Sequence, residues 1–292
     1  MQRKQIALAK EYGLSGFCYY YYWFDNGKRL LEMPLDRHLH DKSLDFPFCL
    51  CWANENWTRR WDGGNSEILM PQGYKPGWAE QFILDLLPYL KDERYIRVNG
   101  APYLLIYHLQ DIPQPFKVIS TWRSVARENG IEKLHISAVR RTPDASEIKL
   151  SGYTLDSLTD FPPHLVGSFD IDHDDDRKFG LYRGQVKDYR KVCKLHMNMP
   201  KQNYTYFRTV MLEWDNTARK GKDAYVFEDF SFTGFKKWLY CAKRYALRQN
   251  RPGEDLVFIN AWNEWAEGTY LEPSEPLGRT ALEAAKEALE WR

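Results

Sequence analysis

Two glutamates near the end of the sequence, Glu264 and Glu267, have the side chains and the spacing for acid–base chemistry. They follow the apolar run 257–259, which is typical of a strand buried on both faces. Trp262 and Trp265 stand beside them, and an apolar wall raises the pKa of a carboxyl group so that it can donate a proton near neutrality. Because indole faces also stack on pyranose rings, the pair indicates acid–base work on a sugar. A solvated loop after a core strand is the alternative.

Further clusters of aromatic and polar residues recur where other predicted strands end, and His108 and Glu213 belong to them. In an α/β barrel these strand ends meet on one face, so residues far apart in sequence would line one pocket. Core packing is the alternative for any single Trp or Tyr, but the repetition at five strand ends favours the pocket. The candidate substrate-binding residues are Tyr20, Tyr22, Trp23, Trp52, Asn54, Glu55, Asn56, Trp57, Arg59, Arg60, Trp61, Tyr107, Trp214, Asp215, Asn216, Arg219, Trp262, Asn263 and Trp265.

The elements that must position these clusters alternate between strand and helix along the chain. No change of composition marks a domain boundary and no repeat is present, so residues 1–292 are predicted to form one (β/α)8-type TIM barrel of the α/β class. Because the chain opens on a helix, this barrel would lack its first strand. The predicted strands are 16–23, 46–53, 102–107, 134–139, 158–161, 209–214 and 256–261, and the predicted helices are 6–12, 29–40, 78–90, 116–129, 233–248 and 280–291.

Two stretches lack clear periodicity. Residues 58–76 are predicted to form a long polar loop, of the kind that is often functional inside a compact domain. Residues 162–208 contain the acidic run 170–176, whose alternating aspartates resemble a calcium loop but lack the glycine and terminal glutamate of an EF-hand. A solvated acidic turn is favoured, and a metal ligand at His173 is the weaker alternative. We expect no metal, since the other histidines are scattered and no HExxH is present.

Composition limits the class of partner. The 41 basic and 40 acidic side chains leave a net charge of +1, which argues against nucleic acid or an anionic membrane. An aromatic content of 15% favours an oligo- or polysaccharide. No Walker motif, GxGxxG after a strand or GxSxG elbow is present, so we expect no nucleotide cofactor and no serine nucleophile.

The five cysteines have neither paired nor metal-binding spacing, which favours free thiols in a reducing, cytoplasmic setting. No apolar stretch approaches the roughly 20 residues that span a bilayer, so no membrane insertion is expected. The sequence also begins without a signal peptide.

Four segments together resemble the WbsX family, whose members are described as glycosyltransferases of O-antigen and capsule biosynthesis. The segments are 16–20 (GFCYY), 49–61 (CLCWANENWTRRW), 214–219 (WDNTAR) and 259–268 (INAWNEWAEG), and the resemblance runs over nearly the whole chain. That family is in turn similar to the endo-α-mannosidases of glycoside hydrolase family ninety-nine, which are (β/α) barrels.

The resemblance implies roles for both glutamates, because those hydrolases use an Asn-Glu-Trp-x-Glu-Gly motif that residues 263–268 match. Glu264 would draw the proton from the sugar's own 2-hydroxyl, whose oxygen attacks the anomeric carbon and gives an anhydro sugar. Glu267 would protonate the leaving oxygen and later activate water, with net retention. In the usual pair one carboxylate attacks directly or activates water, and spacing alone leaves the three schemes open.

The sequence departs from the family pattern in two places. WbsX proteins normally start with a further strand, so this chain is predicted to be N-terminally truncated. Residues 211–213 (MLE) stand where a Pro-Gly pair is more usual before Trp214.

Three functions follow as hypotheses. The first is a retaining glycoside hydrolase or transglycosylase acting on a polysaccharide, with mannose as one candidate sugar. The second is a glycosyltransferase of lipopolysaccharide O-antigen biosynthesis, and the third is a non-catalytic carbohydrate-binding protein. A sugar-nucleotide donor would need a diphosphate site, and none is found in the sequence, so hydrolase chemistry is favoured.

Overall fold

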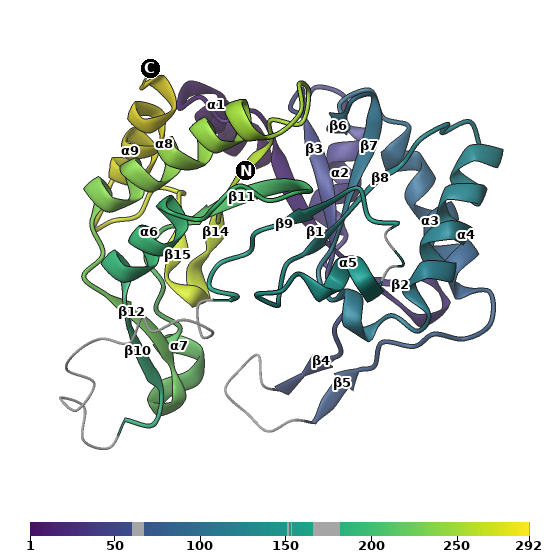
Figure 1. Ribbon diagram of the computed structural model, residues 1–292, viewed down its shortest axis with the longest axis horizontal. Helices are drawn as coiled ribbons and strands as arrows, with labels where there is room; N and C mark the ends of the chain where they lie inside the picture. Colours follow the sequence, from purple (N-terminus) through teal and green to yellow (C-terminus); the bar gives the residue numbers. More distant parts are fainter. Residues whose placement is uncertain (60–66, 151, 153, 166–181, 292) are drawn as a thin grey trace. The chain divides into compact units, whose positions relative to one another are not determined.

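The computed structural model describes residues 1–59, 67–150, 152, 154–165 and 182–291 (Figure 1). The chain forms two compact units. The first consists of Met1–Thr58 and Ile68–Thr159, and the second of Arg59–Glu67 and Asp160–Arg292.

The first unit is built on a parallel sheet whose strands are joined by helices. Residues of β-branched, aromatic and aliphatic type form its parallel strands, and four of these strands are buried at every position. Two short strands, β2 (Lys28–Leu30) and β6 (Arg97–Val98), pair antiparallel with β1 (Phe17–Phe24) and β7 (Ala101–Ile106), respectively. The parallel order is β9-β8-β7-β3-β1, with β1 at Phe17–Phe24, β2 at Lys28–Leu30, β3 at Phe48–Trp52, β6 at Arg97–Val98, β7 at Ala101–Ile106, β8 at His135–Val139 and β9 at Ser157–Thr159. All five predicted strands of this region are confirmed.

Amphipathic helices of the first unit bury one face each, and α3 and α4 pack side by side (Figure 1). Between them the rings of Phe82 and Trp122 lie 4.8 Å apart, and Phe82 also lies 4.3 Å from Trp52. The helices are α1 (Gln2–Glu11), α2 (Met33–His40), α3 (Trp78–Leu90), α4 (Pro115–Glu128) and α5 (Ser146–Leu150).

Two predictions for the first unit are wrong in detail. The helix predicted over 29–40 starts only at Met33, because Lys28–Leu30 form β2 and Leu31 has a positive φ of 53° that no helix tolerates. The predicted loop 58–76 contains a short hairpin, in which β4 (Trp57–Thr58) pairs with β5 (Ile68–Met70).

The second unit contains two pairs of parallel strands and one short antiparallel pair. The predicted strand 209–214 lies earlier in the chain, at β11 (Thr205–Met211), and Glu213 and Trp214 follow the end of this strand. In Figure 1 the helices α8 and α9 lie side by side. The pairs are β11 (Thr205–Met211) with β13 (Val257–Asn260), β10 (Gln185–Asp188) with β12 (Tyr225–Glu228) and β14 (Asn263–Glu264) with β15 (Thr269–Tyr270); the helices are α6 (Tyr189–Met197), α7 (Thr217–Lys220), α8 (Phe232–Gln249) and α9 (Thr280–Glu290).

A buried group of polar side chains stands in the core of the second unit. Nε of Arg208 donates to Oδ2 of Asp160 at 2.7 Å, and Tyr206 also donates to Asp160. His196 completes the group, since Nη2 of Arg208 donates to its carbonyl at 2.9 Å. Each of these side chains is buried, so the charges of Asp160 and Arg208 compensate each other away from water.

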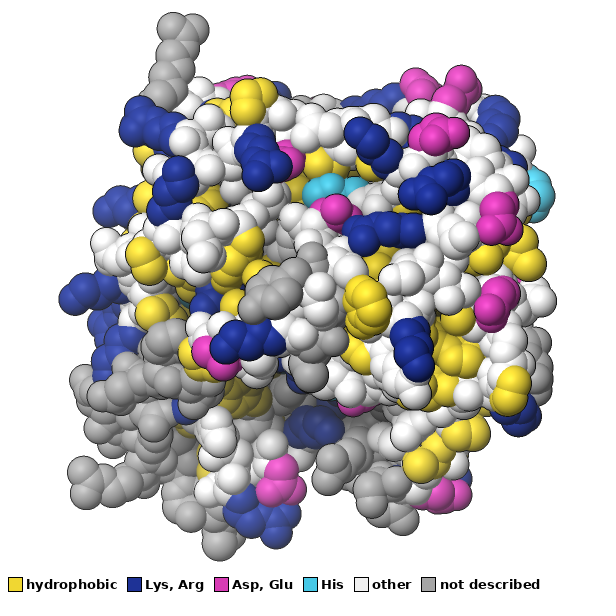
Figure 2. Space-filling model, turned by 45° about the vertical axis from the view of Figure 1, so that its right-hand side comes forward, with side chains coloured by type: hydrophobic (Ala, Val, Ile, Leu, Met, Phe, Trp, Pro, Cys, Tyr) yellow, Lys and Arg dark blue, Asp and Glu magenta, His cyan; other side chains and the backbone are white. Residues whose placement is uncertain are grey.

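The structure confirms the α/β class and the alternation of strand and helix, and closure into a barrel remains a prediction. Figure 2 shows lysine and arginine side chains interspersed with acidic ones, in keeping with the near-zero net charge. Among the described residues no helix is long and apolar enough to cross a membrane. The same residues contain no group of three or more His, Cys, Asp or Glu side chains placed to hold a metal ion.

Candidate active site

The two candidate acid–base residues stand at the ends of one tight turn in the second unit. After β13, the chain forms β14, a 3-10 turn at Trp265–Glu267 and then β15, with Glu264 paired to Thr269. Gly268 allows this return because it lies in the left-handed region, at φ +66°. A Cβ at Gly268 would come within 2.9 Å of the backbone nitrogen of Asp215, so the turn packs closely against the segment that follows β11.

That neighbouring segment supplies the partner of Glu267. Asp215 N–H donates to the carbonyl of Glu267 at 2.8 Å, and α7 follows directly. Arg219 on α7 donates through Nη1 to Oε1 of the Glu267 side chain. Asn216 fixes the start of α7, since its Oδ1 accepts the N–H of Tyr225 at 2.7 Å. The two sequence motifs 214–219 and 263–268 therefore meet in space.

Burial sets the electrostatics of the pair. It raises the pKa of Glu264, and the negative charge of Glu267 raises that pKa further. Burial also raises the pKa of Glu267, and the positive charge of Arg219 opposes the rise at both carboxyl groups. Both glutamates are thus shifted toward the pH range in which a carboxyl group can give and take a proton in catalysis.

An exposed aromatic surface adjoins the pair. The Trp265 ring stacks on Tyr270 with centroids 4.0 Å apart and an angle of 22°, yet 47% of Trp265 stays exposed. Its Nε1 donates to Glu272 at 3.2 Å, which fixes the orientation of the indole. Such a braced and exposed indole can stack on a sugar ring. The other predicted residues of this unit are exposed or partly exposed around the turn, namely Trp214, Asp215, Trp262 and Asn263.

The first unit carries a second group of predicted residues, which we call the aromatic row: Tyr107, Tyr20, Tyr22 and Trp57. Tyr20 and Tyr22 lie on the same face of β1 because side chains alternate along a strand. Ring centroids are 6.3 Å apart from Tyr107 to Tyr20, 5.7 Å from Tyr20 to Tyr22 and 5.4 Å from Tyr22 to Trp57. All four side chains are partly exposed, so the row offers successive ring faces and edges to a ligand.

A polar cluster borders this row. His108 follows β7, with Nε2 2.9 Å from Oε1 of Glu55 and Nδ1 3.2 Å from Oδ2 of Asp111. Glu55 was a predicted site residue, whereas Asp111 was missed. The signal that could have found Asp111 is its position three residues after His108, which places both side chains on one side of a 3-10 turn.

Three predicted binding residues instead belong to the core of the first unit. Trp23 and Trp52 are fully buried, where Trp23 Nε1 donates to Asp85 at 2.8 Å and Trp52 Nε1 donates to the Trp23 carbonyl at 3.1 Å. Asn54 is buried beneath His108. Their polar atoms have hydrogen-bond partners within the protein, so in this structure they are core residues, and their part in substrate binding stays a prediction.

Other predicted residues also have intramolecular partners. Asn216 is buried and supports Tyr225, as described above. Exposed Asn56 accepts the N–H of Gln72 at 2.6 Å, and exposed Arg59 pairs with Glu67 at 2.7 Å. Arg60 and Trp61 lie outside the described residues, as do the acidic run 170–176 and His173.

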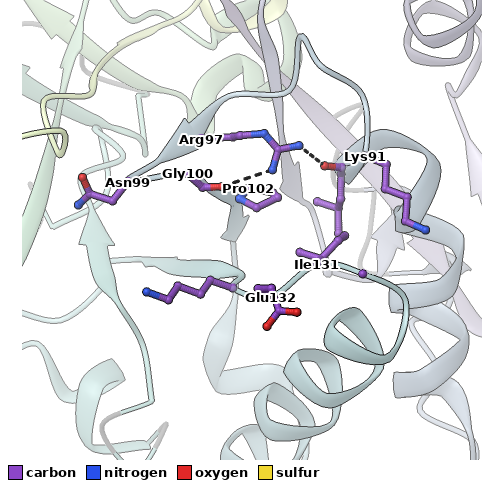
Figure 3. Close-up of a pocket in the computed structure, with 10 residues that line it drawn as sticks. Lys91, Arg97, Asn99, Gly100, Pro102, Ile131 and Glu132 are labelled. Carbon is purple, nitrogen blue, oxygen red and sulfur yellow. Dashed lines mark hydrogen bonds between the residues drawn. The ribbon is translucent and has the colours of Figure 1, made fainter.

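A hollow of about 430 Å³ lies elsewhere, near the beginnings of β7 and β8 (Figure 3). Arg97 lines it, and its guanidinium donates to the Leu90 carbonyl at 2.8 Å. None of the predicted site residues lines this hollow, and Tyr107 of the aromatic row follows the opposite end of β7. We therefore describe two separate candidate regions, the glutamate turn in the second unit and the aromatic row in the first.

Comparison with known proteins identifies close sequence relatives. The family model described as Glycosyltransferase WbsX matches residues 1–285. Uncharacterized protein WxcX from two strains of Xanthomonas campestris pv. campestris is 36% identical over 291 residues, which are 99% of this chain and 41% of that protein. The chain thus spans about two fifths of the length of the curated relatives it matches.

Solved structures show a similar fold. One described as a glycoside hydrolase-like protein has a TM-score of 0.67 at 14% identity and covers 100% of this chain and 86% of its own. The GH99 endo-alpha-mannosidase from Bacteroides thetaiotaomicron has a TM-score of 0.57 at 13% identity and covers 99% and 78%. At these identities the likeness establishes the fold.

Proposed function

The chain belongs to the WbsX glycosyltransferase family, and from this we propose that it is a carbohydrate-active enzyme that cleaves or transfers glycosidic bonds of a polysaccharide with net retention. One observation carries the proposal. Glu264 and Glu267 flank a single turn, burial raises the pKa of both, and Arg219 contacts Glu267. Two carboxyl groups in such surroundings can divide the roles of acid and base.

In the proposed first step, Glu264 takes the proton of the sugar's 2-hydroxyl, and that oxygen attacks the anomeric carbon. The bond from the anomeric carbon to the leaving oxygen breaks, and the proton of Glu267 passes to the leaving oxygen. In the second step Glu267 takes a proton from water while the water oxygen attacks the anomeric carbon. The anhydro ring opens, and Glu264 returns its proton to the 2-oxygen.

Glu267 suits the part of the acid and base that alternates between charge states. Burial favours its neutral form, which can donate a proton, while Arg219 stabilises the carboxylate left behind. The substrate class we propose is a mannose-containing surface polysaccharide, such as an O-antigen or a capsule. Support comes from the WbsX family and from the fold shared with an endo-alpha-mannosidase.

A transferase is the second candidate, and the family description favours it. It needs no different residues if a sugar hydroxyl replaces water in the second step, because Glu267 can deprotonate either one. A donor activated as a sugar nucleotide would require different chemistry at the leaving group. An assay with sugar-nucleotide donors separates these two routes.

The proposal is tested by incubating the protein with mannose-rich glycans and O-antigen polysaccharides and analysing the products. Release by the parent, with loss in both Glu264→Gln and Glu267→Gln, is the expected result. If the folded parent binds these glycans without releasing or transferring sugar, and binding survives Glu267→Gln, the protein is a carbohydrate-binding protein and the enzymatic proposal fails.

Replacing Arg219 by methionine is expected to move the pH–activity profile to higher pH. The Arg219 charge lowers the pKa of both glutamates, so its removal raises both values. Glu267 must be protonated to act as an acid. The descending limb of the kcat/KM profile should therefore move to higher pH. Lys222→Met removes one exposed positive charge from the same unit and serves as the control. A downward shift, or an equal shift in both variants, would contradict the assigned role of Arg219.

A further inference from the structure

The polar cluster beside the aromatic row contains a histidine held between two carboxylates. The Nε2 and Nδ1 atoms of His108 face Glu55 and Asp111, at 2.9 Å and 3.2 Å. Nε2 approaches Oε1 of Glu55 closely without forming a hydrogen bond. Each ring nitrogen of His108 therefore faces one carboxylate oxygen.

The backbone of His108 is fixed as firmly as its ring. His108 N–H donates to Oδ1 of Asn54 at 2.8 Å, and Nδ2 of Asn54 donates to the His108 carbonyl at 2.7 Å. Asn54 itself is buried just after β3. These two hydrogen bonds join the ends of the neighbouring strands β3 and β7. They fix the position of His108 relative to Glu55, which is the next residue after Asn54.

Glu55 is the accessible member next to the aromatic row. Its side chain is 34% exposed, against 17% for His108. The His108 ring lies 5.2 Å from that of Tyr107, and the Glu55 charge acts on the Tyr107 hydroxyl, adding to the effect of burial in raising its pKa. Arg141 approaches the same ring, with Cζ 5.5 Å from its centroid. Glu55 therefore presents a carboxylate at the end of the row.

We propose that Glu55 accepts a hydrogen bond from a sugar hydroxyl bound at the aromatic row, and that His108, braced by Asp111, is the positioning residue that holds the Glu55 carboxylate there. The inference rests on the proposed function, because it presumes that the row binds a glycan. Sugar hydroxyls donate and a carboxylate only accepts, so a fixed carboxylate selects hydroxyls that point toward it. The cluster thereby sets which sugar orientation the row accepts.

A metal site does not account for the same residues. Glu55 and Asp111 contact opposite nitrogens of one ring, so the two carboxylates do not converge on a shared point. A simple structural tether between His108 and Asp111 remains the competing explanation. In that explanation Glu55 has no part in binding, so experiment can distinguish it from the proposal.

The experiment uses three replacements of His108 that remove different contacts. Glutamine reaches about as far as Nε2 and keeps a polar group facing Glu55, asparagine reaches about as far as Nδ1 and keeps one facing Asp111, and phenylalanine keeps neither. The probe is yeast α-mannan together with an O-antigen polysaccharide. For each variant KM and kcat are measured by product release, dissociation constants by affinity electrophoresis, and thermal unfolding midpoints in parallel. Exposed His40→Gln is the matched control.

We expect His108→Gln to keep KM within about threefold, and His108→Asn, His108→Phe and Glu55→Gln each to raise it roughly tenfold, the scale of one charged hydrogen bond. The kcat values should change much less. The double variant Glu55→Gln with His108→Phe should bind no more weakly than either single one, because both act through the same carboxylate.

Four outcomes would overturn the inference. If His108→Asn keeps the affinity and His108→Gln loses it, the Asp111 tether is what matters. If KM follows the unfolding midpoint across the variants, the role is structural. If the parent acts through Glu264 and Glu267 while the His108 variants bind like the parent, only this inference fails. If the parent neither binds nor cleaves any probe, the proposed function fails with it.

Discussion

Replacing Glu267 by glutamine is expected to lower kcat/KM for polysaccharide cleavage by roughly 10²–10⁴-fold, the usual contribution of general acid–base catalysis. Glutamine keeps the shape and the contact with the Asp215 segment, which runs through the backbone, so the fold should persist. The loss should shrink with an aryl glycoside, whose leaving group departs without protonation. Single-turnover kinetics with both substrates measure this difference.

Glu264→Gln should behave differently with the same two substrates. Its proposed task is to take the proton of the 2-hydroxyl, which a better leaving group does not replace, so its loss should persist with the aryl glycoside. Glu275→Gln, an exposed residue of the same unit, is the control. An equal pattern for Glu264 and Glu267, or full activity in either variant, would contradict the division of roles.

Replacing Arg208 by methionine is expected to lower the free energy of unfolding by about 3–5 kcal/mol, the cost of leaving a buried charge without its partner. Asp160 would keep the Tyr206 hydrogen bond but lose the guanidinium that compensates its charge. The double variant Asp160→Asn with Arg208→Met should be less destabilised than the sum of the two single variants. Urea denaturation of all four proteins measures this. Additive losses would show that the pair does not act as a unit.

The destabilisation caused by Arg208→Met should depend on pH. Burial opposes ionisation of Asp160, but the Arg208 charge and the His196 and Tyr206 hydrogen bonds outweigh it and hold its pKa well below the usual range. A depressed pKa contributes stability above the unfolded value, near ~3.9, and loses it as the pH falls. Without Arg208 the pKa of Asp160 rises. The deficit of Arg208→Met should therefore narrow from pH 7 toward pH 4, and a constant deficit would contradict the assignment.

The alternation of strand and helix was predictable because long apolar runs and helical periodicity mark elements that are buried on a full face. β3 and β7 show this, since every residue in them is buried. Short elements held by a few specific contacts were missed. α6 is the instructive case, because Asp188 caps it by accepting the N–H of Arg190 at 2.8 Å, and its buried residues recur at helical spacing. That signal was present and overlooked.

The candidate site was predictable in its chemistry and less so in its geometry. The spacing of Glu264 and Glu267 identifies the pair, but the Arg219 contact depends on how two distant motifs pack. Trp23 and Trp52 are of the same residue type as the candidate binding tryptophans and also lie at strand ends. Only their burial distinguishes them from those candidates. Successive side chains of a strand point to opposite faces of the sheet, so two tryptophans at the end of a strand can differ in burial. The residue type alone does not say which of them is exposed.

The close fit of Gly268 against Asp215 makes segments 214–219 and 263–268 a single module for protein engineering. A graft of the Asn-Glu-Trp-x-Glu-Gly turn alone onto another protein would bring the two carboxyl groups without the Asp215 backbone that Gly268 packs against and without Arg219, which opposes the rise in their pKa values. Homologue chimaeras should accordingly exchange both segments together. A crossover placed between them would combine segments of two different homologues, whose packing surfaces need not match.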